Sequence, residues 1–148
     1  EDQVVECSIA IIHHILSKWY SIELICYDTS RQNLIGNNPH DFERFYNYIG
    51  SLQFNSIFPM EAILKMEYPQ IHRGSSIIII IHHLSHELFN MLYQFRQSGV
   101  FVMVLYIDPS QHIKQDIKEM LEGLNEKDIP TIIIHPDQRL DKILEAWL

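Results

Sequence analysis

Hydrophobic residues along the chain follow two patterns in turn. Helical spacing appears first near the N-terminus, at Val5, Ile9, Ile12, Leu16 and Trp19. Short unbroken runs of aliphatic residues appear later, at Ile77–Ile81 and Val100–Ile107. Such runs are typical of parallel strands that are buried on both faces. The pattern therefore predicts helices and strands in alternation.

The strands are predicted to form one mainly parallel sheet. Its four parallel strands are expected near 22–27, 76–82, 100–107 and 131–134, with a short antiparallel edge strand near 33–35. The segment 76–82 is expected at the centre of the sheet. Alternating strands and helices imply right-handed crossovers with helices on both faces, which is an α/β, Rossmann-like arrangement. We expect a single domain, 1–148.

Capping residues predict where several helices begin and end. Asn38-Pro39 supplies an N-cap followed by proline at the first helical position. A shorter helix is expected from near Pro59. Ser110 is expected to cap a later helix that ends before Gly123.

The chain is acidic and has few cysteines. Its 148 residues carry a formal net charge of −8, which disfavours binding to phosphate backbones, so we expect no nucleic-acid partner. Cys7 and Cys26 lie in apolar surroundings without a CxxC pair, which predicts small core residues in a reducing compartment. The longest aliphatic run, Ile77–Ile81, is far shorter than the ~20 residues that span a bilayer. We therefore expect a soluble piece with no direct membrane insertion. Because it begins at Glu1, we expect it to be a fragment of a larger protein.

Polar residues follow the predicted strands, where ligands collect in open α/β sheets. These candidate ligand residues are Asp28, His82, His83, Asp108 and His135. Imidazoles and carboxylates are good ligands for zinc or manganese. Asp-Pro and His-Pro are also ordinary turn-starting pairs, and residues at strand ends are polar simply because burial stops there. The sequence therefore assigns no catalytic, cofactor or metal residue, and these five remain candidates.

Sequence motifs for nucleotide binding and nucleophilic catalysis are absent. The glycines are isolated, so no GxGxxG or P-loop phosphate cradle is present, and there is no GxSxG elbow. His82-His83-x-x-His86 spans a strand-to-helix turn and lacks the single-face spacing of an HExxH helix. We expect no enzyme activity. The alternative is a metal-assisted hydrolase or phosphotransfer-type enzyme that uses the candidate ligand residues.

Several segments together resemble the C-terminal half of the domain of unknown function 58 family. They are EDQVVECSIAIIHHILSKW at the start, IELICYD, the IIIII strand before a helix, and IIIHPDQRLDKILEAWL at the end. That family is similar to von Willebrand factor A (VWA) domains. The resemblance implies a Rossmann-like sheet and a role in protein interaction near MoxR-type ATPases. It also implies parents that often carry N-terminal membrane helices, with this domain in the cytoplasm.

The chain departs from the VWA pattern at the adhesion site. The DxSxS loop would lie upstream of Glu1, with the first strand of the family fold, and both are absent from this chain. The family's threonine would fall near Asn55-Ser56 and its later aspartate near His82-His83. Imidazoles serve a hard Mg²⁺ ion poorly, because Mg²⁺ prefers oxygen ligands. The metal site is therefore not carried over to this chain.

The sequence favours a binding or assembly module. In VWA-like sheets the absent first strand lies between the strands that correspond to 22–27 and 76–82. Leaving it out would expose backbone groups on two strands. The flanking strands could pair directly, a partner could insert a segment, or two copies could associate through the open edges and the first helix. We expect a homodimer.

Overall fold

The computed structural model describes residues 1–110 and 112–147, with Trp147 by its backbone alone. The chain divides into two compact units, which are described separately below. The first comprises Glu1–Phe58 and Arg139–Leu148, and the second comprises Pro59–Gln138. Compact units can be parts of one domain, so the single domain 1–148 stays a prediction.

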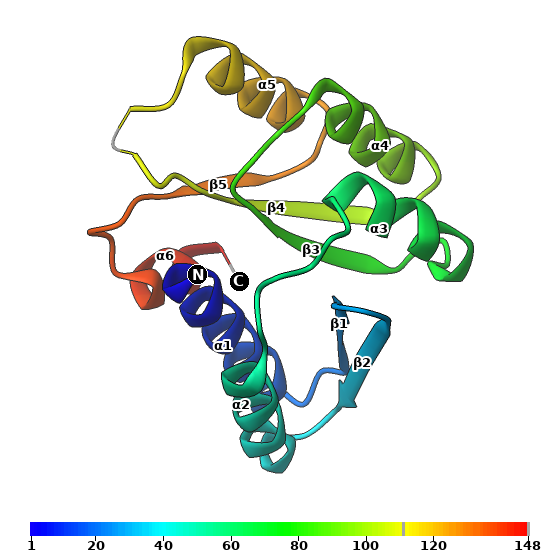
Figure 1. The fold of residues 1–148 in the computed structure, drawn as a ribbon, viewed down its shortest axis with the longest axis vertical. Coiled ribbons are helices and arrows are strands. Elements are labelled where there is room, and N and C mark those ends of the chain that lie inside the picture. The colour runs from blue at the N-terminus through cyan, green and yellow to red at the C-terminus, as the bar shows by residue number, and fades with distance from the viewer. Residues whose placement is uncertain (111, 148) are drawn as a thin grey trace. The chain divides into compact units, whose positions relative to one another are not determined.

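The first unit packs helices against a two-stranded hairpin (Figure 1). Its elements are α1 (Asp2–Ser17), β1 (Ile22–Tyr27), β2 (Arg31–Gly36), a 3₁₀ turn (Pro39–Asp41), α2 (Phe42–Ser51) and α6 (Leu140–Trp147). Helix α1 contacts α2, α6 and β1. The buried core of this unit consists of Ile12, Leu16, Phe45 and Ile49.

Strand β1 pairs only with β2 among the described strands, and the pairing is antiparallel. The predicted return strand is confirmed and is longer than expected. The prediction that β1 is a fourth parallel strand of the main sheet is wrong. The short turn at Asp28–Ser30 reverses the chain, so the nearest pairing partner is the strand that follows at once.

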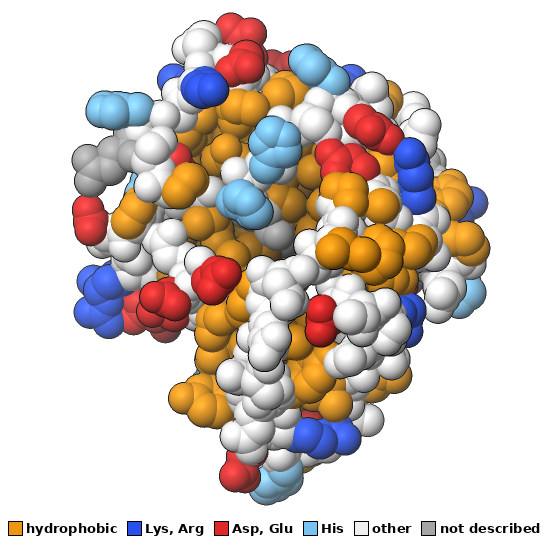
Figure 2. Space-filling view, viewed as in Figure 1, with side chains coloured by type: hydrophobic (Ala, Val, Ile, Leu, Met, Phe, Trp, Pro, Cys, Tyr) orange, Lys and Arg blue, Asp and Glu red, His pale blue; other side chains and the backbone are white. Residues whose placement is uncertain are grey.

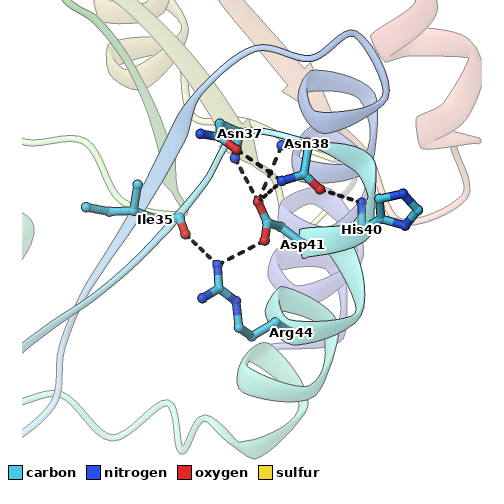
Figure 3. A network of polar contacts seen from close by, with 6 residues as sticks. All are labelled: Ile35, Asn37, Asn38, His40, Asp41 and Arg44. Carbon is cyan, nitrogen blue, oxygen red and sulfur yellow. Dashed lines mark hydrogen bonds and ion pairs between the residues drawn. The ribbon is translucent and has the colours of Figure 1, made fainter.

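A polar network fixes the start of α2 (Figure 3). The Asp41 carboxylate accepts hydrogen bonds from the backbone N–H groups of Asn37 (2.9 Å) and Asn38 (3.4 Å). Arg44 Nη2 donates both to Asp41 Oδ1 (3.2 Å) and to the Ile35 carbonyl oxygen (2.7 Å). Asn38 caps the 3₁₀ turn that leads into the helix, which confirms the helix start predicted from Asn38-Pro39.

Replacing Asp41 with alanine should destabilise the chain at neutral pH. The Asn37 N–H bond is the largest of the effects that hold the pKa of Asp41 below its ordinary value. A carboxyl group with a lowered folded-state pKa stabilises the fold above its unfolded pKa of about 3.9, and the stabilisation is lost as the pH falls through the folded pKa. We expect Asp41→Ala to lower the urea midpoint at pH 7 and to differ less from wild type at about pH 3.

The exposed Glu43 in the first turn of α2 provides the matched control. Glu43→Ala removes the same charge from the same helix end without breaking the network, so its urea midpoint should stay nearer to wild type. An Asp41→Ala effect of equal size at both pH values would contradict this role of the carboxylate.

Both cysteines are free, as expected. Cys7 is fully buried in α1, and burial raises the pKa of its thiol to about 11. Cys26 lies in β1 and is half-buried, and burial also raises the pKa of its thiol. Both thiols therefore stay protonated near neutral pH and behave as small apolar groups.

The second unit is a parallel sheet covered on one face by helices (Figure 1). Its elements are α3 (Met60–Glu67), a 3₁₀ turn (Tyr68–Gln70), β3 (Ser76–Ile81), α4 (His86–Gln97), β4 (Phe101–Ile107), α5 (Gln115–Glu126) and β5 (Thr131–Ile134). Residues of α3, α4 and α5 share one hydrophobic core with alternate residues of the strands. The three predicted parallel strands of this unit are confirmed, as is the helix predicted near Pro59.

The strand order is β3-β4-β5, so β4 is central and β3 is an edge strand. The prediction that Ile77–Ile81 forms the centre of the sheet is wrong. An aliphatic run favours a strand that is largely out of contact with water, but it carries no information on whether the backbone has one neighbouring strand or two. β4 is more deeply buried than β3, and its Val104 and Leu105 side chains are fully buried.

Helix α5 also differs from the expectation. It begins at Gln115 rather than next to Ser110, and it runs through Gly123 to Glu126. Gly123 lies against Phe89 of α4, where an added Cβ would come within 3.3 Å of the ring. The glycine therefore serves close packing between two helices and does not end α5.

Candidate functional site

The carboxyl ends of β4 and β5 bring two of the five candidate ligand residues together. Asp108 follows β4 and His135 follows β5. These strands are parallel neighbours, with Ile107 paired to Ile134, so the residues after them lie side by side. His135 Nδ1 lies 3.3 Å from Asp108 Oδ2. Adjacency of strands explains why residues far apart in sequence meet here.

Asp108 is a buried carboxylate in a polar turn. Only 4% of its side chain is exposed, whereas 37% of the His135 side chain is exposed. Asp108 Oδ1 accepts hydrogen bonds from Ser110 N (3.0 Å) and Ser110 Oγ (3.2 Å). Ser110 thus folds back on Asp108 instead of capping α5, which corrects the predicted helix cap. An aspartate two residues before serine is an ordinary Asx-turn signal that could have indicated this.

The second oxygen of Asp108 is less well satisfied. Within the described part of the chain, Oδ2 has no aligned hydrogen-bond donor, although His135 Nδ1 lies near it. Burial is the main cause that raises the pKa of the neighbouring Tyr106, and the negative charges of Asp108 and Asp116 raise it further. Tyr106 therefore lies in surroundings that are both buried and negatively charged.

His82 and His83 follow β3 and are exposed. Figure 2 shows histidine side chains at the surface, several of them bordered by hydrophobic side chains. Ser85 caps α4 and its hydroxyl also donates to Glu61, and this bond is the first cause of a lowered Glu61 pKa. His83 contributes to the same lowering through its charge. His83 thus lies near Glu61 in the first turn of α3.

Asp28 belongs to the first unit, in the turn between β1 and β2. Its backbone N–H donates to the Ser30 carbonyl oxygen at 3.3 Å. With its side-chain nitrogen turned toward the carboxylate, Asn55 donates to Asp28 Oδ1 at 3.2 Å. Asp28 therefore has a local role in its turn.

The adhesion-type Mg²⁺ site does not fit the residues present. In residues 1–110 and 112–147 no group of three or more His, Cys, Asp or Glu side chains could hold a metal ion. The position expected for an aspartate carries the imidazoles of His82 and His83, which are poor ligands for Mg²⁺.

Among the helices that the structure describes, none combines the length and the apolar character that crossing a bilayer requires.

Comparison with known proteins identifies the fold. No family model and no curated protein sequence matches the chain. A solved structure, the crystal structure of the SpRpn10 VWA domain, is similar with a TM-score of 0.65 at 14% sequence identity. The match covers 95% of this chain and 82% of that chain. The protein therefore has a VWA-like α/β fold, which confirms the predicted fold class.

Proposed function

We propose that this chain is a protein-binding module and that a second copy of it binds at the outer edge of β3. The observation that carries the proposal is the strand order β3-β4-β5, which leaves β3 at the edge of its sheet. In the described part of the chain no strand pairs with the outer side of β3. An open edge of this kind is a template for another strand.

The backbone geometry of β3 defines the groups available for pairing. Phe101 N donates to the Ser75 carbonyl oxygen at 2.8 Å, so Ser75 faces β4. Because alternate residues of a strand direct their backbone groups to opposite sides, Ser76, Ile78 and Ile80 present theirs to the outer edge. These three residues are the backbone donors and acceptors of the proposed interface.

The composition of β3 supports a second copy as the partner. The segment Ser75–Ile81 contains no charged residue and no proline, the features that usually protect an edge strand. In an antiparallel pair of β3 strands related by a two-fold axis at Ile78, Ile78 lies opposite Ile78, Ile77 opposite Ile79 and Ser76 opposite Ile80, and no like charges meet. The chain's net charge of −8 does not oppose this pairing locally, because none of it lies on β3.

The first helix is not part of the proposed surface. Its apolar residues on more than one flank suggested a second contact surface, but α1 contacts α2, α6 and β1 within its own unit. Cys7, Ile11, Ile12 and Leu16 of α1 are buried there. These contacts account for the apolar flanks and leave β3 as the surface to test.

Light scattering across a concentration series tests the proposal. Wild type should approach twice the 17.5 kDa mass of one chain as its concentration rises. Ile78→Pro removes one outward N–H per copy while leaving the bonds to β4. Losing two hydrogen bonds per dimer, at about 1 kcal/mol each, should raise the dimer dissociation constant roughly 30-fold.

Two further variants serve as a matched pair. Ser76→Lys adds a charge on the open edge and should also weaken the dimer, whereas Gln97→Lys adds the same charge on the exposed surface of α4 and should not. A wild-type mass that stays at one chain throughout would rule out the second copy as partner. A dimer that survives both β3 substitutions in folded protein would rule out the edge.

Other expectations remain predictions. A MoxR-type ATPase partner and a cytoplasmic location depend on the resemblance to the domain of unknown function 58 family. The alternative enzyme requires a substrate site, and the contact between Asp108 and His135 is the feature that favours testing it.

A further inference from the structure

Three cationic side chains lie at the amino ends of the strands in the second unit. Arg73 precedes β3, Arg96 lies in the last turn of α4 before β4, and Lys127 precedes β5. Because the three strands are parallel, these positions share one end of the sheet. Within the part of the chain that the structure describes, none of the three is in an ion pair. The chain carries 19 acidic and 11 basic residues, so the lack of ion pairs is not due to a shortage of carboxylates.

Neutral groups hold the two arginines in place. The side chain of Arg73 fills the space beside Gly99, where its Cγ lies 2.7 Å from the position that an added Cβ would take. The Arg96 guanidinium carbon lies 5.2 Å from the centroid of the Phe101 ring, and Arg96 Nε donates to the Asp128 carbonyl oxygen at 3.3 Å. Phe101 is 56% exposed, so part of its ring stays open to a partner. The two charges are thus positioned without being neutralised.

The carboxylates nearest in sequence do not cancel the positive charge. Glu126 and Asp128 flank Lys127 in the chain, and neither is in an ion pair among residues 1–110 and 112–147. Lys127 Nζ lies instead 4.2 Å from the centroid of the Tyr93 ring. A cation over an aromatic ring keeps its charge. In the chain segments that meet at this end of the sheet, three cations therefore outnumber two carboxylates.

We propose that this basic surface, formed by Arg73, Arg96, Phe101 and Lys127, binds an acidic polypeptide segment of another protein. A guanidinium group binds a carboxylate through two parallel hydrogen bonds, and the exposed ring accepts an apolar side chain that lies between acidic ones. Because their neighbours already position the cations, binding orders few further side chains. The net charge of −8 does not prevent binding, since exposed charges more than about 8 Å away are largely screened at physiological ionic strength.

A role in helix stability does not account for all three cations. Arg96 and Lys127 lie at the ends of α4 and α5, where a positive charge is favourable. Arg73 lies outside the helices, between a 3₁₀ turn and β3. Cations that act only at helix ends would affect the urea midpoint and not the affinity for an acidic peptide, so the two measurements separate these roles.

The basic surface is separate from the outer edge of β3. It consists of side chains that precede the strands or lie at the start of β4, whereas the proposed dimer uses backbone groups of Ser76, Ile78 and Ile80. Loss of dimerisation would therefore leave this proposal standing, and loss of peptide binding would leave the dimer standing.

Fluorescence anisotropy with a labelled peptide tests the proposal. The probe is a glutamate-rich peptide with one phenylalanine, at about 0.15 M salt. The same peptide with glutamine in place of glutamate should not bind. Arg73→Gln combined with Arg96→Gln should weaken binding of the glutamate peptide roughly tenfold. Lys114→Gln combined with Lys118→Gln removes two charges from the exposed start of α5 and should leave binding unchanged.

Three results of this experiment would overturn the proposal. One is a glutamate peptide that does not bind wild type. Another is an equal loss of binding in both double variants, which would reduce the effect to net charge. The third is tighter binding of a single-stranded oligonucleotide of the same charge, which would make nucleic acid the partner.

A measurement on wild type alone guards against misfolded variants. The Nε resonances of Arg73 and Arg96, followed by NMR, should shift in a saturable way as the glutamate peptide is added. Peptide binding that leaves both resonances unchanged would overturn the proposal as well.

Discussion

Leu92→Ala should lower the free energy of unfolding by about 3 kcal/mol, within the 2–5 kcal/mol typical of this change at a buried site. Leu92 is fully buried on the inner face of α4. It belongs to the core that α3, α4 and α5 share with β3 and β4. Truncation removes apolar contacts and leaves a cavity that close-packed neighbours fill only in part. Urea unfolding followed by circular dichroism measures the loss.

An exposed aliphatic residue provides the control for this substitution. Ile57 has 82% of its surface exposed, so Ile57→Ala should change stability by no more than about 0.5 kcal/mol. A Leu92→Ala effect as small as that of Ile57→Ala would mean that the core of the second unit is wrongly described.

Phe45→Ala should cost about 3–5 kcal/mol, which is the larger of the two core effects. Phe45 is fully buried in α2 and packs with Ile12, Leu16 and Ile49. An added Cβ at Gly36 would meet the Phe45 ring at 2.6 Å, so the ring fills the space beside the hairpin. Urea unfolding measures this loss too.

Tyr46 is the natural control for Phe45, because it is the next residue of the same helix and 54% exposed. Tyr46→Ala removes an aromatic ring of similar size and should cost less than about 1 kcal/mol. Equal losses from the two substitutions would contradict the assigned inner face of α2.

The two core substitutions together test the single-domain prediction. Leu92 lies in the second unit and Phe45 in the first. If the chain is one cooperative domain, each substitution lowers the protection of both units in hydrogen exchange followed by mass spectrometry. Protection lost in one unit alone would instead show that the units unfold independently.

The elements themselves could be predicted because their signals are local. Asn38-Pro39 marks a helix start through hydrogen bonds within a few residues. Gly99 ends α4 with a φ of +90°, a conformation that glycine adopts readily. The aliphatic runs identified β3 and β4 for a similar reason, because the strand signal lies in each segment's own residues.

Pairing between strands was harder to predict because it depends on residues elsewhere in the chain. The aliphatic run Ile77–Ile81 correctly predicts a strand, yet β4 holds the central position in the sheet. Ile22–Tyr27 and the return strand after it were both predicted, but they were expected in the main sheet, whereas the described strands β1 and β2 form a separate hairpin. A strand's neighbours are decided by turn length and competing edges, which the periodicity of one strand does not contain.

The positions of the candidate ligand residues could likewise be predicted only in part, because they depend on how the strands pair. Asp108 and His135 were both placed at strand ends by sequence, and adjacency of β4 and β5 brings them together. Asp28 was grouped with them because β1 was expected in the same sheet, and it lies instead in the hairpin turn. The Ser110 hydroxyl was assigned to a helix, although a closer acceptor, the Asp108 carboxylate, competes for it.

The contact between α1 and α6 has a consequence for biosynthesis. The second unit is continuous in sequence, whereas the first needs residues 140–147 to complete the packing of its opening helix. At about 5–20 residues per second, translation of the ~120 residues between α1 and α6 takes roughly 6–25 s. During that interval the flank of the nascent α1 that packs against α6 stays exposed, so chaperones are expected to bind it. The second unit can already fold in the same interval, because all of its residues precede α6.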